Sequence, residues 1–194
     1  YAIGGSGVSS VEIFDPSTGQ WSAGPALPAA LAYATAITVD GKILLVGGSN
    51  APSQSTNQVL ELDLGSNQWT QKADMPTARH GMKLVLFEEK VWAIGGSTAT
   101  ASQAVESFDP ATNSWSSEPS LSTGRKWPFA WVANGVIYVA GGYDPYLATV
   151  EVFDPISNQW NSAASLPESK GVSDAVVLGG KVYVVAGQYA SRAY

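Results

Sequence analysis

Cysteine is absent from the 194-residue sequence, and histidine occurs only once. A chain without cysteine forms no disulfide bond and offers no thiolate for catalysis or metal binding. A single histidine also excludes a metal site built from several imidazoles of this chain. We therefore expect no metal and no cofactor. The lack of cysteine says little about the compartment.

Charge and long apolar runs are also scarce. Charged residues make up 13% of the chain, about half the ~25% of an average globular protein. The net charge of −6 disfavours nucleic acid as a main partner, because phosphate backbones attract basic surfaces. No apolar run approaches the ~18 residues of a membrane-spanning helix, so we expect no membrane span. Because the first residue is Tyr1 and not Met, we expect a fragment of a longer protein or a processed chain.

Turn-forming and apolar residues are plentiful instead. The chain contains 20 glycines and 11 prolines, and 45% of its residues are apolar. This apolar content, together with the small net charge, argues against disorder. Frequent turn residues between short apolar runs favour short strands and tight turns.

One residue pattern recurs four times along the chain. Each copy has an Asp, a Trp six residues later, and the end of a small-residue doublet 33 residues after the Asp. All variation in length falls between the doublet and the next Asp, where the spacing is 10, 15, 13 and 12 residues. A fixed frame with one elastic segment indicates a repeated structural unit with one insertion-tolerant loop. The columns are Asp15, Asp63, Asp109 and Asp154; Trp21, Trp69, Trp115 and Trp160; and Gly47-Gly48, Gly95-Gly96, Gly141-Gly142 and Ala186-Gly187, preceded by Gly4-Gly5.

Within a unit the pattern predicts four β-strands. In the third unit, the apolar runs 81–89 and 90–96 meet at a tight turn, Glu88-Glu89. The segments 104–110 and 112–118 follow, and no stretch has sustained helical periodicity. We therefore predict an all-β chain in which each unit of about 46 residues is a four-stranded antiparallel meander. The counterparts of the Glu88-Glu89 turn are Asp40-Gly41, Asn134-Gly135 and Gly179-Gly180, all typical hairpin dipeptides.

Residues that recur with the period are expected to serve the fold. We expect the Trp column to be structural and the Asp column to act as a turn or cap device. The Glu column (Glu12, Glu106 and Glu151) is expected to be structural as well. The glycine doublets are predicted to lie where neighbouring chain approaches too closely for a side chain.

These elements together resemble the kelch repeat, a β-propeller blade of roughly 50 residues. The resemblance rests on "IGG", "VGG" and "AGG", on "VEIFDP", "VESFDP" and "VEVFDP", on the following Trp, and on "MPTAR". It implies an all-β, kelch-type β-propeller of four-stranded antiparallel blades. A WD40 propeller has a similar period, but the chain contains no Trp-Asp or Gly-His dipeptide. The departures from the pattern are Leu31 in a basic column, Leu60 in the Glu column and Ala186 in the last doublet.

We expect residues 1–194 to form a single propeller domain or part of one. Complete blades are predicted at 33–72, 80–118 and 127–163, and a partial blade at 1–23 with 172–186. This arrangement has seventeen strands, and the strands at Tyr1 and Tyr183 occupy the same repeat column. Two strands cannot fill one position, so we favour an incomplete ring, about four blades plus an extra terminal strand, over a closed four-bladed ring. An incomplete ring would expose apolar sheet surface and favour self-association.

The antiparallel order places all variable loops at one end of every blade. Short turns join the first strand to the second and the third to the fourth, whereas the variable loops and the crossovers between blades lie at the opposite end. The longest of these loops, Ser49–Gln58, is expected to be polar and solvated. The candidate binding residues gather at this loop end. They are Arg79, His80, Arg125, Lys126, Trp127, Tyr143, Asp144, Tyr146 and Lys170.

The basic residues at the loop end have two interpretations. Arg79, Arg125 and Lys170 recur at one position and would suit an anionic ligand or an acidic peptide. Alternatively, they bond neighbouring loops and carbonyl groups, as kelch-like units often do. His80 and Lys126 flank this column and vary between units, which favours recognition.

The aromatic residues at the loop end also have two interpretations. Trp127 would stack on a sugar or a side chain, or it would cover the adjoining blade. The loop with Tyr143, Asp144 and Tyr146 would contact a ligand, or it would pack on itself as a turn fixed by Pro145.

We therefore predict a non-catalytic binding module that presents these loops to a protein or glycan partner. The kelch resemblance implies the same, because such domains commonly bind partners through the equivalent loops. The alternative is a segment of a carbohydrate-active kelch-propeller enzyme, similar to a sialate mutarotase or galactose oxidase, with part of its active site in other blades. A third hypothesis is a repeat arc that mainly mediates assembly. The low lysine content and the many Ser, Thr, Gly and Asn residues favour a secreted or cell-surface bacterial protein.

Overall fold

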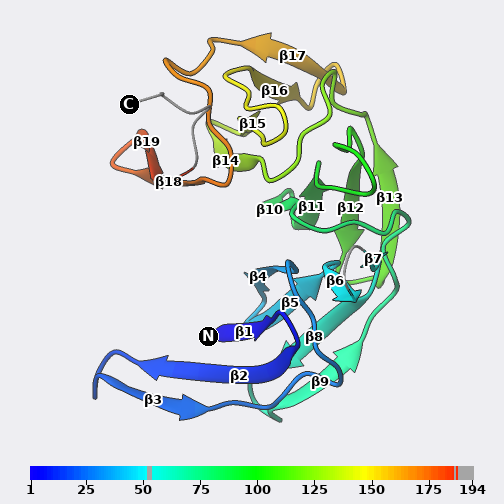
Figure 1. Ribbon diagram of the computed structural model, residues 1–194. Coiled ribbons are helices and arrows are strands. Elements are labelled where there is room, and N and C mark those ends of the chain that lie inside the picture. The colour runs from blue at the N-terminus through cyan, green and yellow to red at the C-terminus, as the bar shows by residue number, and fades with distance from the viewer. Residues whose placement is uncertain (52–53, 186, 188–194) are drawn as a thin grey trace. The chain divides into compact units, whose positions relative to one another are not determined.

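The computed structural model describes residues 1–51, 54–185 and 187, and every regular element in these ranges is a β-strand (Figure 1). The chain divides into two compact units, unit 1 (Tyr1–His80) and unit 2 (Gly81–Tyr194). The lack of helix over the described ranges confirms the predicted all-β class. In the same ranges, no helix has the length and apolar character needed to cross a membrane.

Unit 1 contains two antiparallel sheets and a short ribbon. Its strands are β1 (Ala2–Gly5), β2 (Val8–Asp15), β3 (Gln20–Ala23), β4 (Thr35–Val39), β5 (Lys42–Val46), β6 (Ser49–Ala51), β7 (Gln54–Ser55), β8 (Val59–Asp63) and β9 (Gln68–Gln71). The sheet orders are β1-β2-β3 and β4-β5-β8-β9, and β6 pairs with β7 between them in sequence. A cluster that includes Val11, Leu31, Leu45 and Leu60 forms its core.

Unit 2 repeats the same meander. Its strands are β10 (Lys83–Phe87), β11 (Lys90–Ile94), β12 (Val105–Asp109), β13 (Ser114–Glu118), β14 (Phe129–Ala133), β15 (Val136–Ala140), β16 (Val150–Asp154), β17 (Gln159–Ala163), β18 (Asp174–Leu178) and β19 (Lys181–Val185). They form the sheets β10-β11-β12-β13, β14-β15-β16-β17 and β18-β19. The predicted four-stranded antiparallel meander is confirmed. The proposed sharing of one blade by 1–23 and 172–186 stays a prediction.

Neighbouring sheets of unit 2 pack face to face. Strand β10 contacts β14, and β14 contacts β18, so the first strands of successive sheets are neighbours. Ile94 from one sheet and Ile137 and Val139 from the next are fully buried and lie in one apolar cluster. Burying the apolar face of each sheet against its neighbour is what a repeat of this kind needs, because a single meander cannot cover both of its faces.

The hairpin turns have the geometry that their dipeptides predict. Asp40 and Gly41 have φ of 48° and 71°, and Asn134 and Gly135 have φ of 52° and 73°. Two successive positive φ angles are the mark of a type I′ turn, whose twist matches that of the flanking strands. Glu88 and Glu89 adopt the same conformation, with φ of 49° and 61°, although neither residue is suited to it.

The Trp column has equivalent positions in all four copies. Each Trp stands opposite an apolar residue of the preceding strand: Phe14 opposite Trp21, Leu62 opposite Trp69, Phe108 opposite Trp115, and Phe153 opposite Trp160. The Nε1 of Trp69 donates to Pro25 O, and that of Trp160 to Pro119 O, both at 2.8 Å. These two indoles therefore tie their sheet to the crossover that leads into it.

The Asp column stabilises the turn between the third and fourth strands. Asp63 Oδ1 accepts hydrogen bonds from the backbone N–H groups of Gly65 (3.0 Å) and Ser66 (2.8 Å). Asp109 does the same for Ala111 and Thr112. Hydrogen bonds to the ionised carboxylate lower the pKa of these side chains below their ordinary value. These hydrogen bonds show the turn-capping role that the sequence predicts for the Asp column.

Two features differ from the expectations or lie beyond the described residues. The Ser49–Gln58 loop, predicted to be a solvated loop, contains the ribbon β6–β7. Backbone hydrogen bonds between Ala32 and Ser49, at 2.9 and 2.7 Å, join this loop to a crossover. Its polar residues carry no apolar alternation, so the strands had no sequence signal. Ala186 of the last doublet lies outside the described residues.

Candidate functional site

A backbone hydrogen bond fixes each crossover near its end, shortly before the first strand of the next sheet. The N–H of the second glycine of a doublet donates to the carbonyl of the basic column: Gly48 to Arg79 (3.1 Å), Gly96 to Arg125 (2.8 Å) and Gly142 to Lys170 (2.8 Å). The first glycine of a doublet also lies close to the carbonyl group of the basic column. A Cβ on Gly95, where φ is 65°, would come within 2.9 Å of Arg125 O. The predicted close approach at the doublets is thus present, and it holds the loop end of each sheet in a constant position.

The side chain of Arg125 is fully buried and bonded to its own sheet. Its guanidinium donates to Glu151 Oε1 (2.9 Å from Nη2), to Gly141 O (2.7 Å) and to Thr149 O (3.0 Å). Glu151 Oε2 also accepts hydrogen bonds from the N–H and hydroxyl of Ser122, both at 2.7 Å. Burial lowers the pKa of Arg125, and the hydrogen bonds and charge of Glu151 oppose that shift.

This burial bears on the two interpretations of the basic column. Arg79, in unit 1, and Arg125, in unit 2, both have an exposed fraction of 0%. A guanidinium without exposed surface offers nothing for a ligand to touch. The geometry therefore favours the structural interpretation for these two residues, in which the basic column bonds neighbouring loops and carbonyls.

The departures at Leu31 and Leu60 are explained by the same geometry. Leu31 occupies the basic column and Leu60 the Glu column of a single sheet, as Arg125 and Glu151 do in another. Both leucines are buried in one apolar cluster of unit 1. An apolar pair thus stands where the other sheet has a buried ion pair, a replacement that is often neutral for stability.

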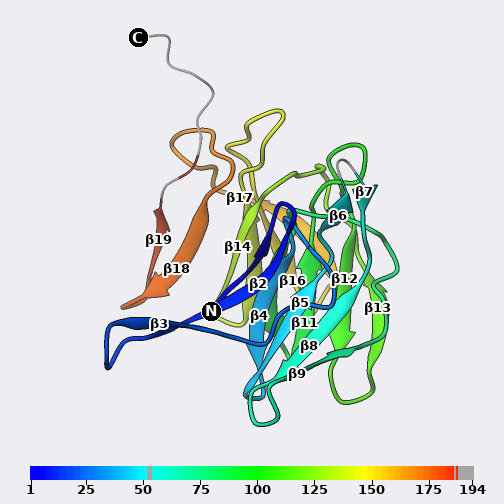
Figure 2. The same cartoon turned by 60° about the horizontal axis from the view of Figure 1, so that its bottom comes forward.

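Five of the predicted residues lie together at the loop end of unit 2. We call Lys126, Trp127, Tyr143, Asp144 and Tyr146 the aromatic loop patch. The rings of Trp127 and Tyr143 are 5.9 Å apart and those of Tyr143 and Tyr146 5.3 Å apart, both edge to face. Lys126 Nζ lies 2.8 Å from Asp144 Oδ2. The loops that join β11 to β12 and β15 to β16 both lie at this end of unit 2 (Figure 2).

Backbone bonds hold the patch. The N–H of Tyr143 donates to Lys126 O at 2.7 Å, and the N–H of Trp127 donates to Gly81 O at 2.9 Å. Lys170 is linked to the same loop, because its N–H donates to Leu147 O at 3.0 Å. The peptide bond between Asp144 and Pro145 is cis. The patch is therefore a folded part of the loop end.

A strained backbone position underlies the patch. The residue two positions after the basic column has a positive φ in all four copies: Tyr33 (56°), Gly81 (60°), Trp127 (45°) and Val172 (54°). Glycine adopts this conformation at no steric cost, whereas other residues are strained in it. The residue types in this column differ in every copy, so the repeat pattern does not reveal it. Gly81 could have indicated it.

His80 belongs to a different group, in unit 1. Its Nδ1 lies 2.8 Å from the hydroxyl oxygen of Ser55, and its ring is 5.8 Å from that of Tyr33. Among the residues that the structure describes, no group of three or more His, Asp and Glu side chains could hold a metal ion.

Known proteins share this repeated frame. The KLHDC2/KLHL20/DRC7 Kelch-repeats domain matches residues 1–187. The chain belongs to the kelch-repeat family. Its four-stranded antiparallel sheets are the blades of a kelch-type β-propeller, as the sequence predicts.

Curated kelch relatives are much longer than this chain. Spermatocyte protein spe-26 of Caenorhabditis elegans is 34% identical over 144 residues, which cover 69% of this chain and 25% of that protein. Kelch-like protein 23 of Homo sapiens is 28% identical over 149 residues, covering 74% of this chain and 26% of that protein. The chain thus spans about a quarter of the length of these relatives.

The fold also matches a solved structure. The structure of YjhT aligns with a TM-score of 0.82 at 16% sequence identity, covering 93% of this chain and 69% of that one. At this identity the likeness shows the fold alone.

Proposed function

We propose that the chain is a protein-binding kelch module and that the aromatic loop patch of unit 2 is its binding surface. Membership of a family that includes the kelch-like proteins supports a protein partner. The observation that carries the proposal is the cluster of aromatic rings, in which Trp127, Tyr143 and Tyr146 lie edge to face at centroid distances of 5.9 and 5.3 Å. The positive φ of Trp127 (45°) belongs to the repeat, because Tyr33 and Val172 share it, and it costs about 1–2 kcal/mol.

The chemistry of the patch suits a peptide partner. Tyr and Trp carry much of the energy of protein interfaces, because they bury a large rigid surface with few rotamers to fix. The side chain of Asp144 is 66% exposed, whereas that of Lys126, its ion-pair partner, is 16% exposed. The patch therefore presents a carboxylate beside aromatic rings, which suits a segment with a basic and an apolar side chain. A glycan at this patch, and a carbohydrate-active enzyme, stay as the alternatives predicted from the sequence.

Selection of a random peptide library on the 194-residue chain tests this proposal. We expect the enriched peptides to lose about tenfold or more in affinity with Tyr143→Ala and with Trp127→Gly. The Trp127→Gly change removes the indole and also relieves the strained backbone, so loss of folding is not its expected effect. Ile156→Ala is the control, because Ile156 is 95% exposed in the β16–β17 turn at the opposite end. Peptides bound equally well by both patch variants would contradict the proposal.

We also propose self-association of this chain through the face of β18–β19. Its apolar side chains Val176, Leu178 and Tyr183 are 52%, 68% and 48% exposed. The sheet has only these two strands over the described residues, whereas its neighbours in unit 2 have four. An exposed apolar face beside a short sheet suits pairing with a second copy.

A further inference from the structure

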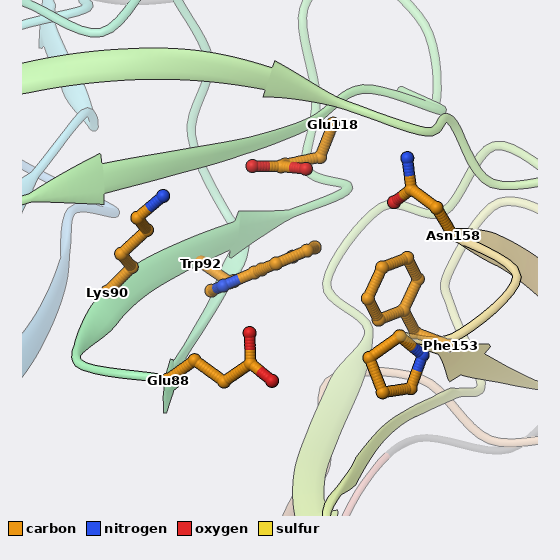
Figure 3. A pocket seen from close by; sticks show the side chains of 7 residues that line it. Glu88, Lys90, Trp92, Glu118, Phe153 and Asn158 are labelled. Atoms are coloured by element: carbon orange, nitrogen blue, oxygen red, sulfur yellow. The ribbon is translucent and has the colours of Figure 1, made fainter.

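A recess lies in unit 2, near the hairpin turns, and shares no residue with the aromatic loop patch. It has a volume of ≈ 160 Å³. We call it the turn-end pocket. Its lining residues are Glu88, Lys90, Trp92, Glu118, Phe153, Pro155 and Asn158 (Figure 3). The sheet β10–β13 contributes the first four, and β16 with the β16–β17 turn contributes the rest.

Trp92 has a buried polar atom that the fold does not satisfy. The residue is 5% exposed, and its Nε1 has no hydrogen-bond acceptor among the described residues. A buried donor without an acceptor costs free energy. In Figure 3 the nitrogen-bearing edge of the ring lies on the side of Glu88 and Lys90, and the other edge points toward Phe153. The two rings are 4.9 Å apart.

The repeat itself does not require an indole here. The equivalent position of the second strand is Leu44 in unit 1 and Tyr138 and Tyr183 in unit 2. The frame thus accepts a smaller apolar or aromatic side chain. Since the fold does not need the indole N–H, a ligand in the pocket that accepts its hydrogen bond would explain why a tryptophan stands here.

The other polar groups of the pocket include both donors and acceptors. Glu118 Oε1 accepts a hydrogen bond of 2.6 Å from the hydroxyl of the buried Ser107, which fixes this carboxylate and leaves its second oxygen for a ligand. Glu88 and Asn158, which are exposed, and the half-buried Lys90 also line the pocket (Figure 3). Phe153 and Pro155 supply an apolar wall.

Charge and hydrogen bonding narrow the class of ligand. A guanidinium or ammonium group would be attracted by Glu88 and Glu118 and repelled by Lys90. Because it has only donors, it would still leave the Trp92 N–H unpaired. An anion would meet the carboxylates of Glu88 and Glu118. A neutral polyhydroxyl compound both donates and accepts, and its C–H face can pack on the apolar wall. The volume is small beside the roughly 300–1,000 Å³ of pockets for drug-sized ligands, so it suits one ring.

We infer that the turn-end pocket binds a single pyranose ring of a neutral saccharide. This inference is independent of the proposed peptide binding at the aromatic loop patch, since the two sites share no residue. The expected contacts are hydroxyl groups that donate to Glu118 and Glu88, a ring face on Phe153 and Pro155, and, after a small displacement of the buried indole, a saccharide oxygen that accepts from Trp92 Nε1.

NMR titration of the ¹⁵N-labelled chain with methyl glycosides of glucose, galactose and N-acetylglucosamine tests this inference. The chain has 7 tryptophans, and the indole resonance of Trp92 is the one missing from Trp92→Phe. We expect at least one glycoside to shift this resonance in a saturable way. Glu118→Gln should weaken the binding about fivefold or more, because one charge-assisted hydrogen bond loses its charge. Glu89→Gln, a neighbouring change outside the pocket, should leave the affinity unchanged.

Three outcomes would overturn the inference. The first is that no glycoside shifts the Trp92 resonance. The second is that Nα-acetyl-arginine amide shifts it and the glycosides do not, which would assign the pocket to a basic peptide side chain. The third is equal binding by Glu118→Gln and the unchanged chain. If Trp92→Phe fails to fold, sequential assignment identifies the resonance, and the two Glu variants still decide the question.

Discussion

The buried pair of Arg125 and Glu151 links a crossover to the third strand of its own sheet. The guanidinium also bonds the carbonyl groups of Gly141 and Thr149, and the carboxylate bonds Ser122. This one pair thus holds three chain segments together at the loop end. In unit 1 the corresponding place is filled by Leu31 and Leu60 in an apolar cluster.

A double-mutant cycle measures what the pair contributes. We expect Arg125→Leu or Glu151→Leu alone to lower the free energy of unfolding by about 3–5 kcal/mol, because each leaves a buried charge unpaired. The double variant should recover most of that loss, as the Leu31–Leu60 arrangement suggests. Urea unfolding followed by Trp fluorescence gives the three values. A double variant as unstable as the sum of the singles would show that the leucine pair is no model for this site.

The sequence predicted which residues occupy equivalent positions, but not whether their side chains are buried or exposed. A constant spacing shows that residues occupy equivalent positions, and both a cation ring and a buried link give the same spacing. Leu31 and Leu60 were the available signal, since two departures that fall in one sheet indicate contact between the columns. The unused N–H of Trp92 had no such signal, because hydrogen bonding depends on neighbours that are distant in sequence.

At the scale of the element, the β10–β11 hairpin carries strain that its neighbours avoid. Glu89 has a φ of 61° at the position where the β14–β15 hairpin has Gly135. We expect Glu89→Gly to raise the free energy of unfolding by about 1 kcal/mol, because glycine adopts a left-handed conformation without steric cost. The reciprocal change Gly135→Glu should lower it by a similar amount. Chemical denaturation measures both, and a stabilising Gly135→Glu would contradict the argument.

The Asp column, at the turn between the third and fourth strands of each sheet, makes the stability of the fold depend on pH in the acid range. Hydrogen bonds, led by those from Ser17, Ser66, Thr112 and Ser157, lower the pKa of Asp15, Asp63, Asp109 and Asp154 from the ordinary 3.8. A lowered folded-state pKa stabilises the fold above the ordinary value, and this contribution is lost as the pH falls through the lowered one. We therefore expect the melting temperature to drop below about pH 4. Replacing the four residues by Asn should flatten that drop, and an unchanged pH profile would contradict it.

Strand positions were predictable to within about two residues, because apolar alternation and hairpin dipeptides mark them directly. The β6–β7 ribbon was not, since its residues are polar and its pairing depends on a crossover far along the chain. The positive φ at Trp127 and Val172 was hidden for a related reason. Residue types poorly suited to a conformation cannot signal it.

At the scale of the whole molecule, exposed apolar sheet surface predicts association. We expect light scattering of the 194-residue chain to show a mass that rises with concentration, because Val176 and Leu178 of β18 lie exposed. Val176→Lys with Leu178→Lys should shift the chain toward the monomer, since like charges would then oppose each other. A constant monomer mass for the unchanged chain would contradict this expectation.

We propose that a constant frame of meanders positions variable loops for binding at one end. Hydrogen exchange of the chain with and without a selected peptide tests this placement. We expect slow exchange in β10–β17 in both states, and new protection on peptide binding at residues 126–127 and 141–149. Protection confined to the turns at 110–113 and 155–158, with none at the loop end, would contradict it.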